Sequence, residues 1–128
     1  MMLHKELTDE ILHAFYKVHR KLGFGFLEKV YKNALFLELN EVGLKCETEK
    51  SINVYYNGRV VGIFYADIVV EGKIILELKA VESICKEHEY QLINYLKACE
   101  MEIGLLLNFG KSAELKRIIY TNDRKELI

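Results

Sequence analysis

Ionisable residues interrupt two apolar stretches of this chain, and this pattern constrains the fold more than any other feature of the sequence. Asp67 lies in the first stretch, and Glu77 and Lys79 lie in the second, where they alternate with Leu76 and Leu78. Because successive side chains of a β-strand point to opposite faces, Glu77 and Lys79 fall on one face. Burying such groups costs free energy unless each has a partner. The pattern therefore predicts neighbouring strands that bring charged side chains into one site.

This group of charges has a simple structural interpretation, which is a half-buried salt bridge on a solvated face of the sheet. A metal site is the alternative that we favour, because Asp67 and Glu77 fall on adjacent predicted strands joined by a short turn. Two carboxylates that approach each other repel unless a cation or a proton lies between them. Oxygen ligands of this kind suit magnesium or manganese.

Two further segments carry polar residues that can reach the same site. Gln91 and Tyr95 lie four residues apart on a predicted helix, on one face with His88, where all three interrupt an apolar stripe. Glu28 follows the glycine-rich turn of residues 23–25 and opens another predicted helix. A carboxylate at a helix N-terminus is also stabilised by the helix dipole, so Glu28 has a structural explanation of equal weight.

Hydrophobic periodicity and turn residues predict eight elements in the order ααβββαββ. Thr8 or Asp9 is a suitable N-terminal cap for a first helix that ends before Gly23, and Gly43 is a suitable C-terminal cap for the second. The later elements are a strand from residue 51, a hairpin turn at Asn57-Gly58, strands over 60–70 and 73–79, a helix over 86–99, and strands over 103–109 and 117–120. We expect an α/β fold with a mixed central sheet flanked by helices.

Composition limits the class of protein. A chain of 128 residues that is 51% hydrophobic and 29% charged has the composition of a folded globular domain. Its apolar runs are far shorter than the roughly 20 residues of a membrane span, and no signal-peptide pattern is present, so we expect a cytoplasmic protein with no membrane partner. Three cysteines without a CxxC pair argue against a disulfide framework or a cysteine-bound metal. With a net charge of −1, nucleic acid must be bound through a local patch and a cation.

The order of these residues resembles the PD-(D/E)xK nuclease superfamily, which is typified here by Asp67, by Glu77-x-Lys79 and by the helical Gln91 and Tyr95 pair. The helical pair is similar to the RecB-like branch of that superfamily. The segment from Gly25 through Glu28 to Tyr31 is similar to the motif of the GxxExxY protein family, which is assigned to the same superfamily. The resemblance extends from about Asp9 to Tyr120. The proline that often precedes the aspartate in the superfamily is replaced by Ala66.

The resemblance implies a restriction-endonuclease-like core and a role for each matching residue. Asp67, Glu77 and the carbonyl group of Leu78 would bind Mg²⁺ or Mn²⁺. Glu28 would complete or extend that metal shell through a water. Lys79 would hold the attacking water and offset the charge that develops on the scissile phosphate.

The resemblance also implies substrate contacts near the metal. Gln91 and Tyr95 would position the substrate or the outer shell of the metal. His19 and His88 are further candidates for the metal shell, although a lone histidine beside a helix core is more often a structural residue. The residues that we expect to contact the substrate are Gln91, Tyr95, Arg20 and Lys21.

We therefore expect a metal-dependent nuclease that hydrolyses phosphodiester bonds, with DNA favoured over RNA, in one nuclease-like domain over residues 1–128. A homodimer would let such an enzyme act on two strands. The alternative is a catalytically silent module that keeps the nuclease fold and binds nucleic acid or protein, which the near-neutral charge favours. A zinc hydrolase built on His19 or His88 fails on spacing, because the chain has no HxxxH or HxH pair.

The turn between the second and third strands tests whether the two acids can share a site. If Glu71-Gly72 were a two-residue loop, Asp67 and Glu77 would lie on opposite faces of the sheet. A three-residue loop of residues 70–72, with Gly72 at positive φ, would set Asp67 opposite Ile75 and both acids on one side. We predict this odd-length loop, or a bulge within residues 61–67 that restores the same parity.

Overall fold

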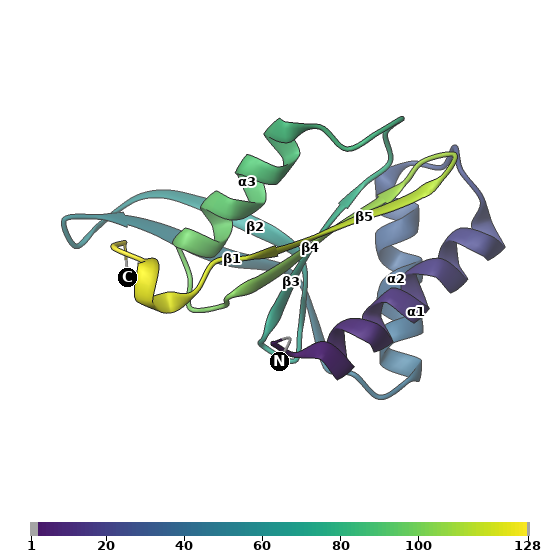
Figure 1. Cartoon of the computed structure of the whole chain (residues 1–128), viewed down its shortest axis with the longest axis horizontal. Coiled ribbons are helices and arrows are strands. Elements are labelled where there is room, and N and C mark those ends of the chain that lie inside the picture. The colour runs from purple at the N-terminus through teal and green to yellow at the C-terminus, as the bar shows by residue number, and fades with distance from the viewer. Residues whose placement is uncertain (1–2, 128) are drawn as a thin grey trace.

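A computed structural model describes residues 3–127 as helices packed on a five-stranded sheet (Figure 1). The helices are α1 (Lys5–Leu22), α2 (Glu28–Glu41) and α3 (Lys86–Lys97), with a short 3-10 helix at Asn122–Arg124. The strands are β1 (Cys46–Tyr56), β2 (Arg59–Val70), β3 (Ile74–Lys79), β4 (Ile103–Phe109) and β5 (Ala113–Ile119). The predicted order ααβββαββ is confirmed. None of the helices in this part of the chain is long and apolar enough to cross a membrane.

The sheet is mixed, as predicted, and its strands follow the order β1-β2-β3-β4-β5. Only β3 and β4 are parallel, and α3 forms the crossover between them, because parallel neighbours cannot be joined by a tight turn. The other neighbouring strands are antiparallel. β1 and β2 form a long hairpin whose tip projects beyond the rest of the sheet (Figure 1).

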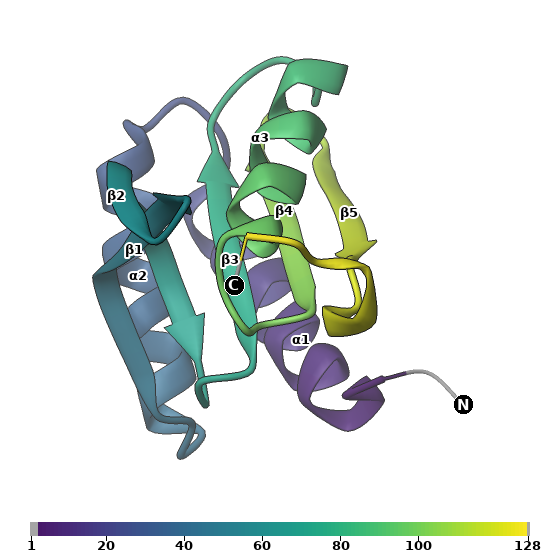
Figure 2. The ribbon, with the colours of Figure 1, turned by 90° about the vertical axis from the view of Figure 1, so that its left-hand side faces the viewer.

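Helices cover both faces of the sheet. Figure 2 shows α3 in front of the strands and α1 and α2 behind them. Ile74, Leu76 and Leu78 of β3 belong to the core beneath α1 and α2, whereas Ile75 belongs to the core beneath α3. By the same alternation, Glu77 leaves β3 on the α3 side of the sheet.

The structure corrects the predicted ends of several elements. α1 begins at Lys5, so neither Thr8 nor Asp9 caps it, and Thr8 is buried inside the helix with 3% of its surface exposed. β1 begins at residue 46 instead of 51, and β5 covers 113–119 instead of 117–120, because pairing with a buried neighbouring strand extends both polar segments. α3 ends at residue 97 instead of 99.

Two predicted turn signals are confirmed. Gly43 has a φ of 88°, and the N–H of Leu44 donates to the carbonyl of Leu39 at 3.0 Å, as in a left-handed helix cap. Asn57 and Gly58 have φ values of 50° and 77° and form a two-residue hairpin loop. Both turns depend on residues that tolerate positive φ.

The turn between β2 and β3 has the predicted odd length. Val70 pairs with Ile74, so the loop consists of residues 71–73, one residue further along than predicted. Gly72 has a φ of 64°, as predicted. Continuing the register sets Asp67 opposite Glu77, so the predicted partner Ile75 was wrong. The prediction that both acids lie on the same side of the sheet is confirmed.

The strand β2 becomes irregular at Asp67. Ala66 packs in the core beneath α3, whereas Ile68 packs beneath α1 and α2, although residues two apart on a regular strand share a face. Across from Asp67, Glu49 of β1 has a φ of 50°, which is uncommon for any residue other than glycine. The irregularity lies where β2 separates from β3.

β4 and α3 approach closely at Gly104. A Cβ atom at this position would lie 2.8 Å from Cγ and Cδ1 of the buried Leu92. We expect Gly104→Ala to lower the free energy of unfolding by about 1–3 kcal/mol, because the added methyl group forces Leu92 or α3 away from the sheet. Urea unfolding of both single variants and of the double variant with Leu92→Ala checks this contact. The double variant should lose less than the sum of the single losses, and fully additive losses would contradict the prediction.

Candidate active site

Asp67 and Glu77 join β2 and β3 at the point where the ladder between these strands ends. The last paired residues are Ile68 and Leu76. Beyond them, the N–H of Leu78 donates to Oδ2 of Asp67 at 2.8 Å, and the N–H of Asp67 donates to Oε1 of Glu77 at 3.3 Å. Each carboxylate thus takes the place of a main-chain acceptor on the opposite strand. The two acids are therefore held side by side.

Both carboxyl groups have raised pKa values. Glu77 is 6% exposed, and its burial, together with the charge of Asp67, raises its pKa to about 8. Burial also raises the pKa of Asp67, against the lowering effect of the hydrogen bond from Leu78. The pair therefore resists carrying two negative charges unless a proton or a cation compensates them.

Glu28 and Lys79 extend this pair into a cluster of charges. Lys79 lies two residues after Glu77, so both side chains leave the same face of β3. Glu28 is the first residue of α2. Its pKa is raised, first by partial burial and then by the carboxylate of Asp67, while Lys79 lowers it. The structure thus brings these four predicted residues close to one another.

Tyr31 fixes the turn that precedes Glu28. Its side chain is fully buried, and its hydroxyl donates to the carbonyl of Gly23 at 2.6 Å and accepts the N–H of Phe26 at 3.2 Å. Its ring stacks on Phe109 with the centroids 4.4 Å apart. The sequence motif assigned Tyr31 no role of its own, although a buried tyrosine hydroxyl usually has a hydrogen-bond partner.

Gln91 and Tyr95 lie on the face of α3 that meets the acids. Nε2 of Gln91 donates to the hydroxyl of Tyr95 at 2.7 Å, which confirms that the two side chains meet across one helical turn. The Tyr95 ring stacks on Phe64 of β2 with centroids 3.6 Å apart. Burial raises the pKa of Tyr95, and the carboxylate of Glu77 raises it further, which places the hydroxyl near the acid pair.

A second lysine, Lys32, faces the acids from α2. It forms an ion pair with Glu49, the residue with positive φ across from Asp67. The hydrogen bond with Glu49 raises the pKa of Lys32, burial opposes this effect, and the carboxylates of Asp67 and Glu28 add to it. Neither residue was predicted, because Lys32 is one polar residue among several on a helix and the polar segment around Glu49 gave no strand signal.

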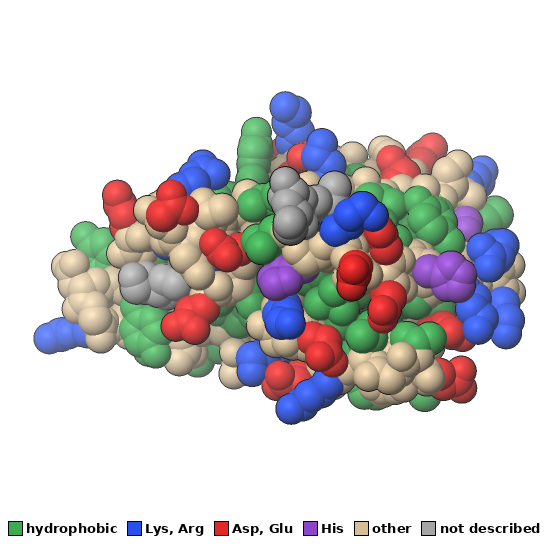
Figure 3. Space-filling view, turned by 60° about the horizontal axis from the view of Figure 1, so that its bottom comes forward, with side chains coloured by type: hydrophobic (Ala, Val, Ile, Leu, Met, Phe, Trp, Pro, Cys, Tyr) green, Lys and Arg blue, Asp and Glu red, His purple; other side chains and the backbone are tan. Residues whose placement is uncertain are grey.

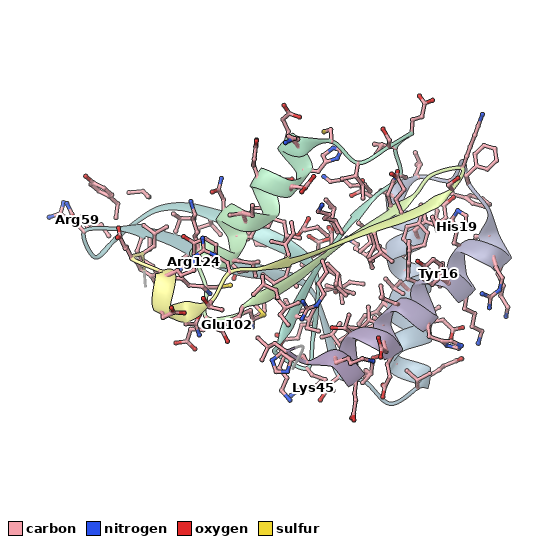
Figure 4. The ribbon with its side chains drawn as sticks, viewed as in Figure 1. Tyr16, His19, Lys45, Arg59, Glu102 and Arg124 are labelled. Carbon is pink, nitrogen blue, oxygen red and sulfur yellow. The ribbon has the colours of Figure 1, made fainter. Side chains whose placement is uncertain are left out.

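The two candidate histidines form structural hydrogen bonds. Nδ1 of His88 accepts the N–H of Cys85 at 3.2 Å and caps α3. Nε2 of His19 donates to the carbonyl of Gly110 at 2.8 Å, in the turn between β4 and β5. Figure 4 shows His19 at the end of the molecule where α1 finishes. Two predicted substrate contacts are exposed in the last turn of α1: Arg20 and Lys21.

Asn108 anchors the chain just after Lys79. It is fully buried, and it pairs with Lys79 in the register of β3 and β4. Oδ1 of Asn108 accepts the N–H of Val81, and Nδ2 donates to the carbonyl of Val81, both at 2.9 Å. Nδ2 also donates to Oε1 of Glu114 at 3.0 Å. A single amide within an apolar run was the signal that could have identified this residue.

The oxygen donors of the cluster fit a hard divalent cation. Within residues 3–127, no three His, Cys, Asp or Glu residues are arranged as a complete metal cage. Mg²⁺ needs no such cage, because it commonly takes one or two carboxylates together with waters and substrate phosphates. Asp67 and Glu77 supply two carboxylates side by side, and their raised pKa values show that two negative charges here are disfavoured without a proton or a cation.

The chain is similar to known proteins in its sequence family and in its fold. The profile of the PD-(D/E)XK nuclease superfamily matches residues 5–118, and the chain belongs to that superfamily. A solved structure, described as "Crystal structure of SSO0001", has a similar fold, with a TM-score of 0.51 and 18% sequence identity. The similarity covers 90% of this chain and 66% of that one. A search of curated proteins found no match.

The raised pKa of Glu77 makes the stability of the metal-free protein depend on pH. Its ordinary pKa is 4.5 and its pKa in the folded protein is about 8, so between these values the folded state binds more protons than the unfolded state. The free energy of unfolding should therefore fall as the pH rises through this range, by several kcal/mol at about 1.4 kcal/mol per unit. Urea unfolding in EDTA measures this fall. Glu77→Gln should flatten the curve, and equal slopes in both proteins would contradict the prediction.

Proposed function

We propose that this protein is a divalent-metal-dependent nuclease that hydrolyses phosphodiester bonds of nucleic acid, with DNA favoured over RNA. The observation that carries the proposal is the paired arrangement of Asp67 and Glu77, with Lys79 on the same face, in a chain of a nuclease superfamily. Residues 1–128 would act as one nuclease-like domain.

The acid pair would bind Mg²⁺ or Mn²⁺. Asp67, Glu77 and the carbonyl oxygen of Leu78 would be the direct ligands, and Glu28 would bind through a water. A bound ion of this kind supplies polarisation of a phosphate and activation of a water. The main-chain hydrogen bonds to Asp67 and Glu77 support this assignment, because they hold both carboxylates in place before any cation arrives.

Lys79 would supply the protein's own positive charge at the scissile phosphate. Its ammonium group would hold the attacking water and offset the negative charge that develops as the phosphodiester bond breaks. Its place on β3 supports this role, because β3 is the central strand of the sheet and is anchored on both sides. Asn108 further fixes the chain on the far side of Lys79 through Val81.

Gln91 and Tyr95 would position the substrate or the outer shell of the metal. Their mutual hydrogen bond and the stacking of Tyr95 on Phe64 keep both side chains in one orientation. This helical pair supports assignment to the RecB-like branch. The Gly25, Glu28 and Tyr31 motif supports assignment to the GxxExxY family, since Tyr31 holds the turn from which Glu28 starts α2.

A catalytically silent binding module is the second candidate. The observation that favours it is the distribution of charge, because Figure 3 shows acidic and basic side chains interspersed over one face of the molecule. The net charge is only −1. Arg20 and Lys21 are exposed and would be available for phosphate contacts in either case.

Metal binding should stabilise the folded protein. We expect millimolar Mg²⁺ or Mn²⁺ to raise the melting temperature, because the ion binds only the folded state, with about 2.7 kcal/mol gained at 100 times the dissociation constant. Differential scanning fluorimetry with each metal measures the shift. Asp67→Asn should remove the shift, whereas the matched control Asp9→Asn, an exposed residue of α1, should keep it. An equal rise of the melting temperature in the wild type and in both variants would show that Asp67 does not bind the metal.

Lys79→Ala should lower the cleavage rate by about 100-fold or more, and the rise of the melting temperature with metal should remain. The matched control is Lys73→Ala in the exposed turn at the opposite end of β3. Plasmid, linear duplex and single-stranded substrates are incubated with each protein and each metal. Undiminished cleavage by Lys79→Ala would show that the activity belongs to a contaminant or that the role is misassigned. A wild-type protein that binds metal and nucleic acid without cutting would support the silent module.

A further inference from the structure

A cleft of about 320 Å³ lies just past the C-terminal end of β3 and takes no part in the chemistry proposed above. It is lined by residues 24–25 before α2, residues 80–82 after β3, and residues 109–111 of the β4–β5 turn. Figure 1 shows these three connections at one end of the molecule. Ala80 directly follows Lys79, and Gly25 lies three residues before Glu28. Two of the segments that line the cleft therefore adjoin, along the chain, residues of the candidate active site.

Buried or half-buried polar side chains fix all three segments that line the cleft. Asn108 holds Val81 through two hydrogen bonds of 2.9 Å. His19 holds the carbonyl of Gly110 at 2.8 Å. Tyr31 holds both ends of the turn at residues 23–26. Because each segment has its own anchor, the cleft is a preformed feature and not a gap between loose loops.

The β4–β5 turn and the segment after β3, which both line the cleft, are in close contact at Gly110. A Cβ atom at this position would lie 2.5 Å from the carbonyl oxygen of Val81, so only glycine allows the β4–β5 turn to approach the segment after β3. Phe109 forms the apolar floor beside it and is 1% exposed. The shape of the cleft thus depends on a specific close approach.

The mouth of the cleft combines an aromatic face with charge. Phe24 is 57% exposed, and Nζ of Lys111 lies 5.7 Å from the centroid of its ring. Glu82 lies at the rim and can accept hydrogen bonds from N–H groups. A flat aromatic group could stack on Phe24, its N–H groups could donate to Glu82, and a phosphate attached to it could pair with Lys111. A free phosphate satisfies only Lys111 and is repelled by Glu82.

We propose that this cleft binds an unpaired nucleobase next to the phosphate that is cleaved, so that the substrate is single-stranded or locally unpaired nucleic acid. This inference rests on the proposed nuclease function. The base would stack on Phe24, and Lys111 would bind the neighbouring phosphate. A base within a duplex is already paired and stacked, so it must leave the helix before it can enter the cleft.

Fluorescence anisotropy tests the cleft separately from cleavage. All proteins carry Lys79→Ala and are titrated in Mg²⁺ against a labelled single strand, the same strand as a duplex, and a strand without bases. Phe24→Ala and Lys111→Gln alter the cleft. Their matched controls are Tyr56→Ala and Lys73→Gln, an exposed tyrosine and an exposed lysine outside the cleft. Melting temperatures verify that each variant is folded.

We expect Phe24→Ala to weaken binding of the single strand by about 10-fold or more, with no effect on the strand without bases. Lys111→Gln should weaken both strands, and the controls should bind like the parent protein. Equal affinity for duplex and single strand, or an equal loss in Phe24→Ala and Tyr56→Ala, would overturn the inference. If the wild type cleaves nucleic acid but Phe24→Ala does not change binding, the base-binding cleft is wrong and the nuclease proposal stands. If binding depends on Phe24 but the wild type does not cleave, the nuclease proposal is wrong and the cleft stands.

Discussion

The reciprocal hydrogen bonds between Asp67 and Glu77 and the opposite main chains are the constraint on which the candidate site depends. In a regular antiparallel pair the ladder would continue past Ile68 and Leu76, and the space between the strands would be closed. Here the two carboxylates take over the acceptor positions, so β2 can leave β3 and continue with β1 as the projecting hairpin. The same carboxylates hold the strands together and face the space that their separation opens. The carboxylate oxygens that link the two strands are therefore also the candidate metal ligands.

Much of the fold could be predicted because the signals were local. The positive φ values at Gly43, Gly58 and Gly72 follow from the backbone freedom of glycine at positions where the hydrophobic pattern breaks. The alternation of Glu77 and Lys79 with leucines indicated one face of a buried strand. A shared site for Asp67 and Glu77 required an odd-length loop or a bulge, and the odd-length loop is present, one residue further along, because Val70 is paired and Lys73 joins the loop.

The contacts that the sequence did not reveal are those between distant segments. Asn108 and Val81 are 27 residues apart, and Tyr31 bonds to a turn whose path is unknown until α1 and α2 are packed. Glu49 could not be placed, because its backbone conformation depends on the irregularity in β2. Thr8 was predicted to cap α1 from its local preference, but packing extends α1 toward its N-terminus as far as Lys5, so Thr8 lies inside the helix. Local preference is weak against tertiary contacts of this kind.

The balance of charge around the acid pair limits how this protein could recognise a polyanion. The carboxylates of Glu28, Glu49 and Asp67 outnumber Lys32 and Lys79 in this region, and Lys32 already pairs with Glu49. Glu77, whose pKa is about 8, adds a fourth negative charge when a cation displaces its proton. Without a bound cation the local field therefore repels phosphate, and a net charge of −1 offers no compensating attraction from the rest of the surface. A divalent cation between Asp67 and Glu77 would remove most of this repulsion, but it would add little further attraction. Affinity for nucleic acid would then have to come from contacts that do not depend on net charge, such as stacking on exposed aromatic rings.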